Sequence, residues 1–367
     1  MFNRKTYLAD NWTLGDAGTR TFDLNVTDPI SVLWIKFQAT NGGTSNRVNT
    51  LGECISAVEI IDGADVLYSL TGAQALALAC YQYGALPRQV VPETPDSPFT
   101  YNLPILFGRY PGDTEYALDP SRFTNPQVRV TWNLAAIRAV GATGFLTGTL
   151  QVSIIANVME GVSNPTHFLM AKQHYTWTSV AAGTEYIDLP TDYPYRAAIF
   201  RGVKWANPWH WMWDQIRINC DGGKFIAMNE RGWDLINELS ALQGRFHYRH
   251  DFYAGNGVVL ATLLGESESL SLLPSVIVDC VPEYSSTGAG GGSLQVRTAG
   301  ALDAALRHWI GDVSGWNPYD CVYYPFGRQD TPAEWFPSGA FKGVKLEVRG
   351  GVADALMSVC LVQDRAY

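Results

Sequence analysis

The 367-residue sequence predicts an all-β fold of two tandem jelly rolls, each with about eight strands and a short helix after an Asp-Gly hairpin. Three observations lead to this prediction: short apolar segments bounded by Gly, Pro, Asn or Asp, very few helical segments, and an internal repeat. Residues 33–39 show the strand pattern, because every second residue is apolar, as in a half-buried strand. Many short strands with few helices are typical of sandwiches and jelly rolls.

The composition excludes several classes of protein. Only 17% of the residues are charged, against about 25% in an ordinary soluble chain, and 47% are hydrophobic, which excludes a disordered chain. The net charge of −9 excludes a mainly basic nucleic-acid binder. The first ten residues lack the apolar segment of a signal peptide, so we expect none. Six widely spaced cysteines form no CxxC pair, so we expect reduced core thiols and no zinc site.

The internal repeat is carried by three sets of residues that recur in the same order. The first is an Asp-Leu pair at residues 23–24 that recurs at 188–189. The other two sets are the Asp-Gly pairs Asp62-Gly63 and Asp221-Gly222, and the triplets Phe107-Gly108-Arg109 and Phe326-Gly327-Arg328. Because both copies keep this order, we predict that one jelly roll was duplicated.

A helix is predicted after the Asp-Gly pair in each copy. Residues 73–83 end at Gly84, which occupies the position of a left-handed C-terminal cap. Thr71 and Gln74 have the spacing of a capping box at the start of this helix. The corresponding helix of the second copy covers about residues 231–242 and ends at Gly244.

The second copy contains an insertion. The offset between the copies rises from 160 at the helix-ending glycines, Gly84 and Gly244, to 219 at the Phe-Gly-Arg triplets, so about 59 residues are added. A Gly- and Ser-rich run at 285–293 indicates a flexible loop there. The predicted organisation is an N-terminal arm (1–20), jelly roll 1 (21–160), a linker (161–170) and jelly roll 2 (171–367), with a large loop insertion at about 245–325.

In four stretches, residues 58–70, 106–109, 118–127 and 189–194, the sequence resembles the double jelly-roll major capsid proteins of tailless icosahedral viruses. The resemblance is greatest to bacteriophages with an internal membrane, and adenovirus hexon is a distant relative in architecture. It implies a viral major capsid protein that forms homotrimeric, pseudo-hexagonal capsomers, which tile an icosahedral shell above a lipid vesicle. The insertion is expected to form an exposed crown or an inter-subunit clasp.

The resemblance also implies the partners and the location of the protein. The expected partners are further copies of the chain, neighbouring capsomers, penton and minor capsid proteins, and an internal membrane reached through the N-terminal arm. We expect no direct contact with nucleic acid, no cofactor, no metal and no catalytic residue. The expected location is the virion, after assembly in the host cytoplasm.

The run from Trp205 to Trp213 is the most aromatic stretch of the chain. Trp209, Trp211 and Trp213 alternate, so on a strand they share one face. We expect Trp205, Trp209, Trp211 and Trp213 to fill the interior of a roll or a subunit interface. The alternative is an aromatic platform for a sugar.

A second candidate stretch contains Arg245, His247 and His250. These residues suit phosphate binding, base stacking or a metal, but no third metal ligand is visible, so an exposed or inter-subunit strand is the favoured interpretation. The alternative function for the whole chain is a tandem jelly-roll carbohydrate-binding protein or glycan hydrolase. Its paired carboxylates would come from Glu115, Glu185, Asp214, Glu266 and Glu268.

Overall fold

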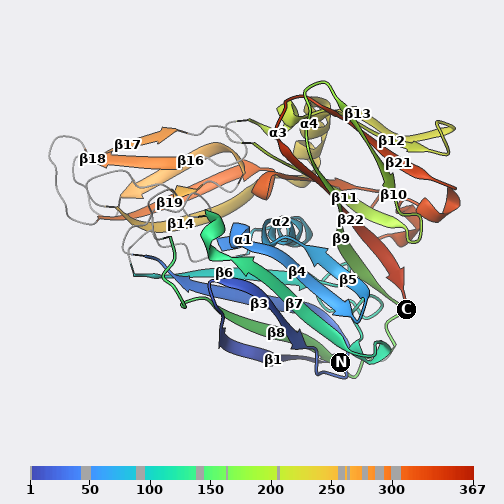
Figure 1. The fold of residues 1–367 in the computed structure, drawn as a ribbon, viewed down its shortest axis with the longest axis horizontal. Helices are drawn as coiled ribbons and strands as arrows, with labels where there is room; N and C mark the ends of the chain where they lie inside the picture. Colours follow the sequence, from blue (N-terminus) through green and yellow to red (C-terminus); the bar gives the residue numbers. More distant parts are fainter. Residues whose placement is uncertain are drawn as a thin grey trace.

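The computed structural model describes residues 2–42, 51–87, 96–137, 144–162, 164–204, 207–254, 261–262, 265–274, 280–285, 293–298 and 307–367; between 249 and 313 the description covers the backbone. These residues form 22 strands, four α-helices and several single turns of 3-10 helix. The strands build two rolls that lie one on the other, with a small β-rich extension to one side (Figure 1).

Roll 1 contains the first eight strands of the chain. They are β1 (Phe2–Thr13), β2 (Ala17–Asp23), β3 (Ile30–Thr40), β4 (Ile55–Asp62), β5 (Asp65–Leu70), β6 (Pro98–Leu106), β7 (Pro126–Asn133) and β8 (Gln151–Glu160). One sheet has the order β1-β8-β3-β6, and β2-β7-β4-β5 are consecutive neighbours in the other. This pairing of early with late strands, across two facing sheets, defines a jelly roll.

Roll 2 repeats that topology strand for strand. Its strands are β9 (His167–Thr178), β10 (Thr184–Leu189), β11 (Tyr195–Val203), β12 (Trp213–Cys220), β13 (Phe225–Arg231), β20 (Cys321–Pro325), β21 (Val344–Gly350) and β22 (Leu356–Ala366). They pair in the orders β9-β22-β11-β20 and β10-β21-β12-β13. The prediction of two tandem eight-stranded jelly rolls is therefore confirmed.

The two rolls share one continuous sheet. A parallel bridge between Ser69 of β5 and Lys172 of β9 joins a sheet of roll 1 to a sheet of roll 2, giving eight strands in a row. The hydrophobic core of roll 1 also continues into roll 2, where it includes Ile199, Cys321 and Val362. The rolls therefore form a single packed unit.

Each roll carries a one-turn helix before its fourth strand and a three-turn helix after its fifth. In roll 1 these are α1 (Leu51–Cys54) and α2 (Gly72–Tyr83), and in roll 2 they are α3 (Trp209–Met212) and α4 (Gly232–Gln243). Figure 1 shows α2 between the two rolls and α4 on the outside of roll 2. Accordingly, α2 is buried along its whole first nine residues, whereas α4 buries only one stripe.

The predicted capping of α2 is present. The Thr71 hydroxyl accepts the backbone N–H of Gln74, and the Gln74 side chain accepts the backbone N–H of Thr71. Gly84 ends the helix with a φ of 67°, in the left-handed region. Gly244 after α4 also has a positive φ, but its ψ of 179° lies outside the left-handed helical region, so it is not a left-handed cap.

Three expected boundaries were wrong. Residues 2–13 are not an arm but strand β1, which pairs with β8 over its whole length. Both faces of β1 are largely exposed, so its sequence lacks the alternation of apolar and polar residues that predicts a strand. The linker is shorter than 161–170, since β9 starts at His167. Roll 2 therefore begins at 167.

The insertion is not one long loop. It forms two three-stranded sheets, β14-β19-β16 and β15-β18-β17. The strands are β14 (Phe246–Ala254), β15 (Ala261–Thr262), β16 (Glu266–Pro274), β17 (Cys280–Ser285), β18 (Ser293–Thr298) and β19 (Arg307–Trp316). Most of the Gly-rich run, residues 286–292, lies outside the described residues. No helix in the described part of the chain is long and apolar enough to span a membrane.

The burial of α2 gives a first prediction. Leu76 is fully buried in α2, so Leu76→Ala should leave a cavity and cost about 2–5 kcal/mol. The thermal unfolding midpoint should fall by several degrees. Leu356→Ala removes the same atoms from an exposed position and should leave the midpoint nearly unchanged. Equal shifts in both variants would contradict the placement of α2.

Candidate functional site

The aspartates of the two Asp-Gly turns make equivalent hydrogen bonds in the two rolls. Asp62 accepts backbone N–H groups from Thr124 and Asn125, at 3.1 and 2.7 Å. Asp221 accepts those of Lys342 and Gly343, at 2.8 and 3.2 Å. Each carboxylate thus fastens a hairpin to the loop that enters the seventh strand of its roll. The following residues, Gly63 and Gly222, have φ values of 61° and 69°, which favour glycine.

The two Phe-Gly-Arg triplets form equivalent bends after β6 and β20. Phe107 and Phe326 are buried, and a Cβ on either Gly108 or Gly327 would come within 2.6 Å of a carbonyl oxygen. The arginines hold the loop that follows: Arg109 binds Asp113 at 2.7 Å and Arg328 binds Glu334 at 2.8 Å.

The carboxyl group of Asp113 is nearly inaccessible to solvent. Burial alone would raise its pKa, but hydrogen bonds from the Arg109 side chain and backbone outweigh burial and hold the pKa below the usual value. Glu115 extends the pair, at 2.7 Å from Arg109. The side chains of Arg109, Asp113 and Glu115 therefore stabilise one loop through contacts within that loop.

Trp209 and Trp211 lie on the one-turn helix α3 and Trp213 is the first residue of β12, so the run does not form one face of a strand. Trp209 and Trp213 are four residues apart across α3, so they share a side and stack with ring centroids 5.3 Å apart. Both are fully buried in the core of roll 2, and the Trp209 indole donates to the Phe200 carbonyl. Trp211 points outward and is 55% exposed, and Trp205 lies outside the described residues.

The prediction of interior packing is confirmed for Trp209 and Trp213. The prediction that Trp209, Trp211 and Trp213 share one face was wrong, because residues 209–212 form a helical turn and not a strand. Buried rings offer no platform to a sugar. Trp211 remains a candidate interface residue. It lies close to His210, whose ring also packs 4.6 Å from that of Trp233.

Polar contacts join the rolls at α1, α2 and β5. The Gln74 amide donates to Gln173 and Ser358, at 2.6 and 3.0 Å, from a buried position. The guanidinium of Arg201 donates to Glu53 at 2.6 Å. These contacts are recognisable only in three dimensions, since their partners are separated by 99 to 284 residues.

At β5 the contact is the ion pair between Asp65 and Arg365, with one N···O distance of 3.0 Å. The hydrogen bond from Arg365 is the main cause that lowers the pKa of Asp65 below its usual value. At the far end of α2, Tyr81 donates to the Cys321 carbonyl at 2.7 Å and stacks on Tyr323. The sequence pattern identifies Gln74 as part of a helix cap, whereas its contacts between the rolls depend on the tertiary structure.

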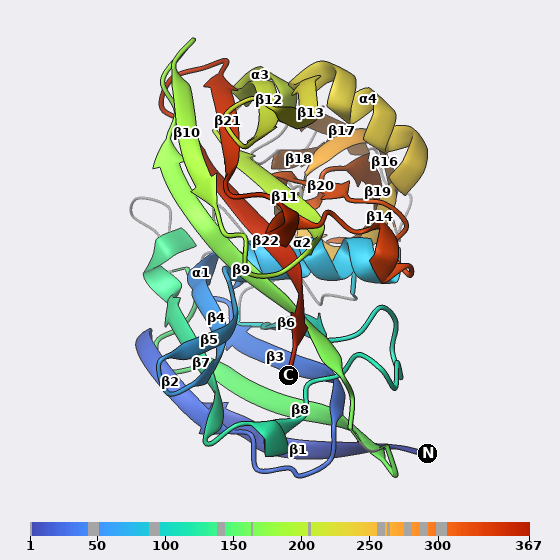
Figure 2. The ribbon, with the colours of Figure 1, turned by 90° about the vertical axis from the view of Figure 1, so that its right-hand side faces the viewer.

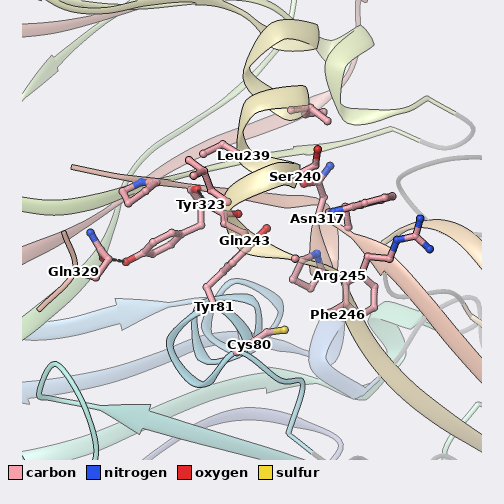
Figure 3. Close-up of a pocket in the computed structure, with 17 residues that line it drawn as sticks. Cys80, Tyr81, Leu239, Ser240, Gln243, Arg245, Phe246, Asn317, Tyr323 and Gln329 are labelled. Atoms are coloured by element: carbon pink, nitrogen blue, oxygen red, sulfur yellow. Dashed lines mark hydrogen bonds between the residues drawn. The ribbon is translucent and has the colours of Figure 1, made fainter. Parts of the chain in front are cut away.

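A cavity of about 290 Å³ lies at this joint, where α2, α4 and the base of the insertion meet. Figure 3 shows Tyr81 and Cys80 on one side, Leu239, Ser240 and Gln243 on the other, and Arg245 at the edge. The guanidinium of Arg245 lies 4.4 Å from the centroid of the Trp316 ring. None of the described residues lining the cavity is Asp or Glu, the groups needed for glycoside hydrolysis.

The candidate carboxylates are dispersed. Glu115 pairs with Arg109, Glu185 accepts the Tyr175 hydroxyl, and Asp214 lies 3.2 Å from Arg349; the side chains of Glu266 and Glu268 lie outside the described residues. Within the described ranges, no group of three His, Cys, Asp or Glu side chains could hold a metal. His247 is exposed on β14, and the side chain of His250 is not described.

Comparison with known proteins gives structural matches only. No protein-family model and no curated protein sequence matches the chain. The STIV major capsid protein aligns with 99% of this chain and 96% of its own, with a TM-score of 0.60 and 9% identity. A chain of the Sulfolobus turreted icosahedral virus aligns over 99% and 90%, with a TM-score of 0.58 and 9% identity.

The major capsid protein P2 of bacteriophage PM2 aligns over 99% of this chain and 98% of its own, with a TM-score of 0.53 and 10% identity. These alignments cover both rolls and the insertion. The chain therefore has the double jelly-roll fold that these viral capsid proteins share. The resemblance stated from the sequence is confirmed for the fold.

The Phe-Gly-Arg bend gives a second prediction. In Gly327→Ala the new Cβ would lie 2.5 Å from the Glu334 carbonyl oxygen, at a φ of 69°. We expect a loss of at least about 1–2 kcal/mol, seen as a lower thermal unfolding midpoint. Gly343→Ala is the control, because its Cβ meets nothing within 4 Å. A Gly327→Ala protein as stable as this control would refute the proposed constraint.

The Asp65–Arg365 pair gives a pH prediction. Because the folded pKa of Asp65 is lowered, its ionised form stabilises the fold above the unfolded value of about 3.9, and this contribution disappears as the pH falls through the folded pKa. Asp65→Asn should therefore lower the unfolding midpoint at pH 7, and the gap to the native protein should narrow below about pH 4. Asp10→Asn, at an exposed carboxylate of β1, should change the midpoint little at either pH.

Proposed function

We propose that this chain is the major capsid protein of an icosahedral virus and assembles as a homotrimeric capsomer of pseudo-hexagonal outline. The observation that carries the proposal is the double jelly roll itself, aligned end to end with viral major capsid proteins. Two rolls of the same topology pack against each other in one chain. Three copies supply six such rolls, which matches a six-sided outline.

The surface chemistry supports assembly through large interfaces. The chain is poor in charge, and large hydrophobic side chains are exposed on both rolls, among them Tyr7, Trp211, Trp233 and Tyr186. Exposed aromatic residues are enriched in interfaces between proteins. We propose that neighbouring capsomers, penton proteins and minor capsid proteins cover such surfaces in the virion.

Membrane contact through residues 1–20 is not part of the proposal. The expected arm is strand β1, whose backbone is paired with β8 from Phe2 to Thr13. A paired strand cannot extend away from the roll toward a vesicle without losing those hydrogen bonds. A membrane contact through residues 2–13 would therefore have to be made by the strand in its paired position.

We propose a structural role and no catalysis. Glu115 and Asp214 are engaged by arginines, Glu185 by a tyrosine, and the cavity lining described above contains no carboxylate. The alternative of a carbohydrate-active protein depended on paired acids and on a tryptophan platform. Two of the four tryptophans are buried in a core, so no specific observation favours that alternative.

The proposal is tested by the mass of the purified protein in solution. Light scattering coupled to gel filtration should give a species of three times 40.4 kDa, and negative-stain images should show six-sided particles. A subunit that stays monomeric at every concentration and cleaves or binds oligosaccharides would contradict the proposal.

A further inference from the structure

The contact between the two rolls joins two different surfaces. Roll 1 contributes the side that carries α1 and α2, and roll 2 contributes the outer face of its β9-β22-β11-β20 sheet. As a result β11 is buried on both faces: Ala198 and Phe200 lie in the core of roll 2, whereas Ala197 and Ile199 lie in the core shared with roll 1. The contact is therefore head to tail.

Roll 2 has its own copy of the first surface, and there it is exposed. Trp211 is the third residue of α3, as Glu53 is of α1, and Asp234 is the third residue of α4, as Gln74 is of α2. Glu53 and Gln74 contact roll 2. By contrast, Trp211, Trp233 and Asp234 face solvent, with exposed fractions of 55% and 56% for the two indoles.

Roll 1 has its own copy of the second surface, on the outer face of the β1-β8-β3-β6 sheet. The strand registers give the equivalent positions. Lys36 lies opposite Ser153 as Arg201 lies opposite Ser358. Lys36 therefore occupies the position of the arginine that binds Glu53.

The next row of that face is apolar. Tyr7 and Trp34 both lie opposite Ile155, as Gln173 and Ile199 both lie opposite Cys360. In roll 2 this row is covered by roll 1, and Ile199 and Cys360 are fully buried. In roll 1 Tyr7 is 60% exposed, and Trp34 and Ile155 are partly exposed.

We propose that α3 and α4 of one copy cover the outer face of the β1-β8-β3-β6 sheet in a second copy of this chain. The contact would repeat between chains the one that joins the rolls within a chain. This inference rests on the proposed capsomer and names the surfaces that build it. α3 and α4 lie at one end of the molecule and β1 at the other (Figure 2), so both surfaces can be engaged at once.

The equivalent positions define the expected contacts. Trp211 faces Lys36 of the next copy, where the indole can accept the ammonium group in a cation–π contact. Asp234 faces Tyr7, whose hydroxyl can donate to the carboxylate. A head-to-tail contact of this kind closes into a ring when its rotation is right, and a ring of three copies alternates rolls 1 and 2.

Four single variants test these contacts by light scattering over a range of concentrations. Trp211→Lys places a second positive charge against Lys36, and Tyr7→Asp places a second negative charge against Asp234. Because like charges repel, each variant should raise the concentration for half-assembly by at least about 30-fold. Trp211→Glu should keep the trimer, because it recreates the pair of Glu53 and Arg201. Tyr186→Lys, at an aromatic residue of β10 that is equally exposed, should also keep it. Unchanged thermal midpoints of the separated subunits would confirm that the variants fold.

A mixture tests the head-to-tail geometry. Trp211→Lys retains an intact sheet face and Tyr7→Asp retains an intact α3–α4 face, so together they should form a two-copy species that neither forms alone. A face that paired with itself would give no such species.

The outcomes separate this inference from the proposed function. If the native protein is trimeric and both disruptive variants remain trimeric, the surfaces are wrongly assigned and the capsomer proposal stands. If the mixture stays monomeric although the native protein is trimeric, the head-to-tail contact is overturned. A native protein that is monomeric at all concentrations rejects both proposals.

Discussion

The burial of α2 between the two rolls is the constraint on which the rest of the structure depends. A helix that is apolar around its whole circumference must be covered on every side. In α2 the residues from Gly72 to Cys80 are all buried, and roll 1 alone offers only one side. Roll 2 supplies the other with β9, β20 and β22, and the buried amide of Gln74 is satisfied by Gln173 and Ser358. The two rolls therefore share one packed core.

The same constraint explains why the duplicated elements diverged. Both rolls keep the turns that position their strands, because Asp62 and Asp221 cap equivalent loops and Gly327 occupies a backbone position that excludes a side chain. Their helices differ, since α2 lies inside the chain and α4 lies at its surface. The Ala-rich sequence of α2 allows close packing, whereas α4 presents Trp, Asp and Glu.

The sequence predicted much of the fold and less of the site. Turn residues, the capping box and the alternation of apolar residues are local signals, and each was confirmed at Asp62, Thr71 and residues 33–39. The N-terminal strand was missed because β1 is exposed on both faces and lacks alternation. The tryptophan run was misread because a four-residue helix and a strand place alternate side chains differently.

By itself the sequence determined the class of fold, the duplication and the turns, because these depend on residues that are close along the chain or repeated within it. Only the tertiary structure decided which copy of each surface is buried. Glu53, Gln74 and Arg201 are ordinary polar residues in the sequence, and their partners lie on another roll. Burial is a property of the whole packed chain, so α2 and Trp209 became interior while α4 and Trp211 remained exposed.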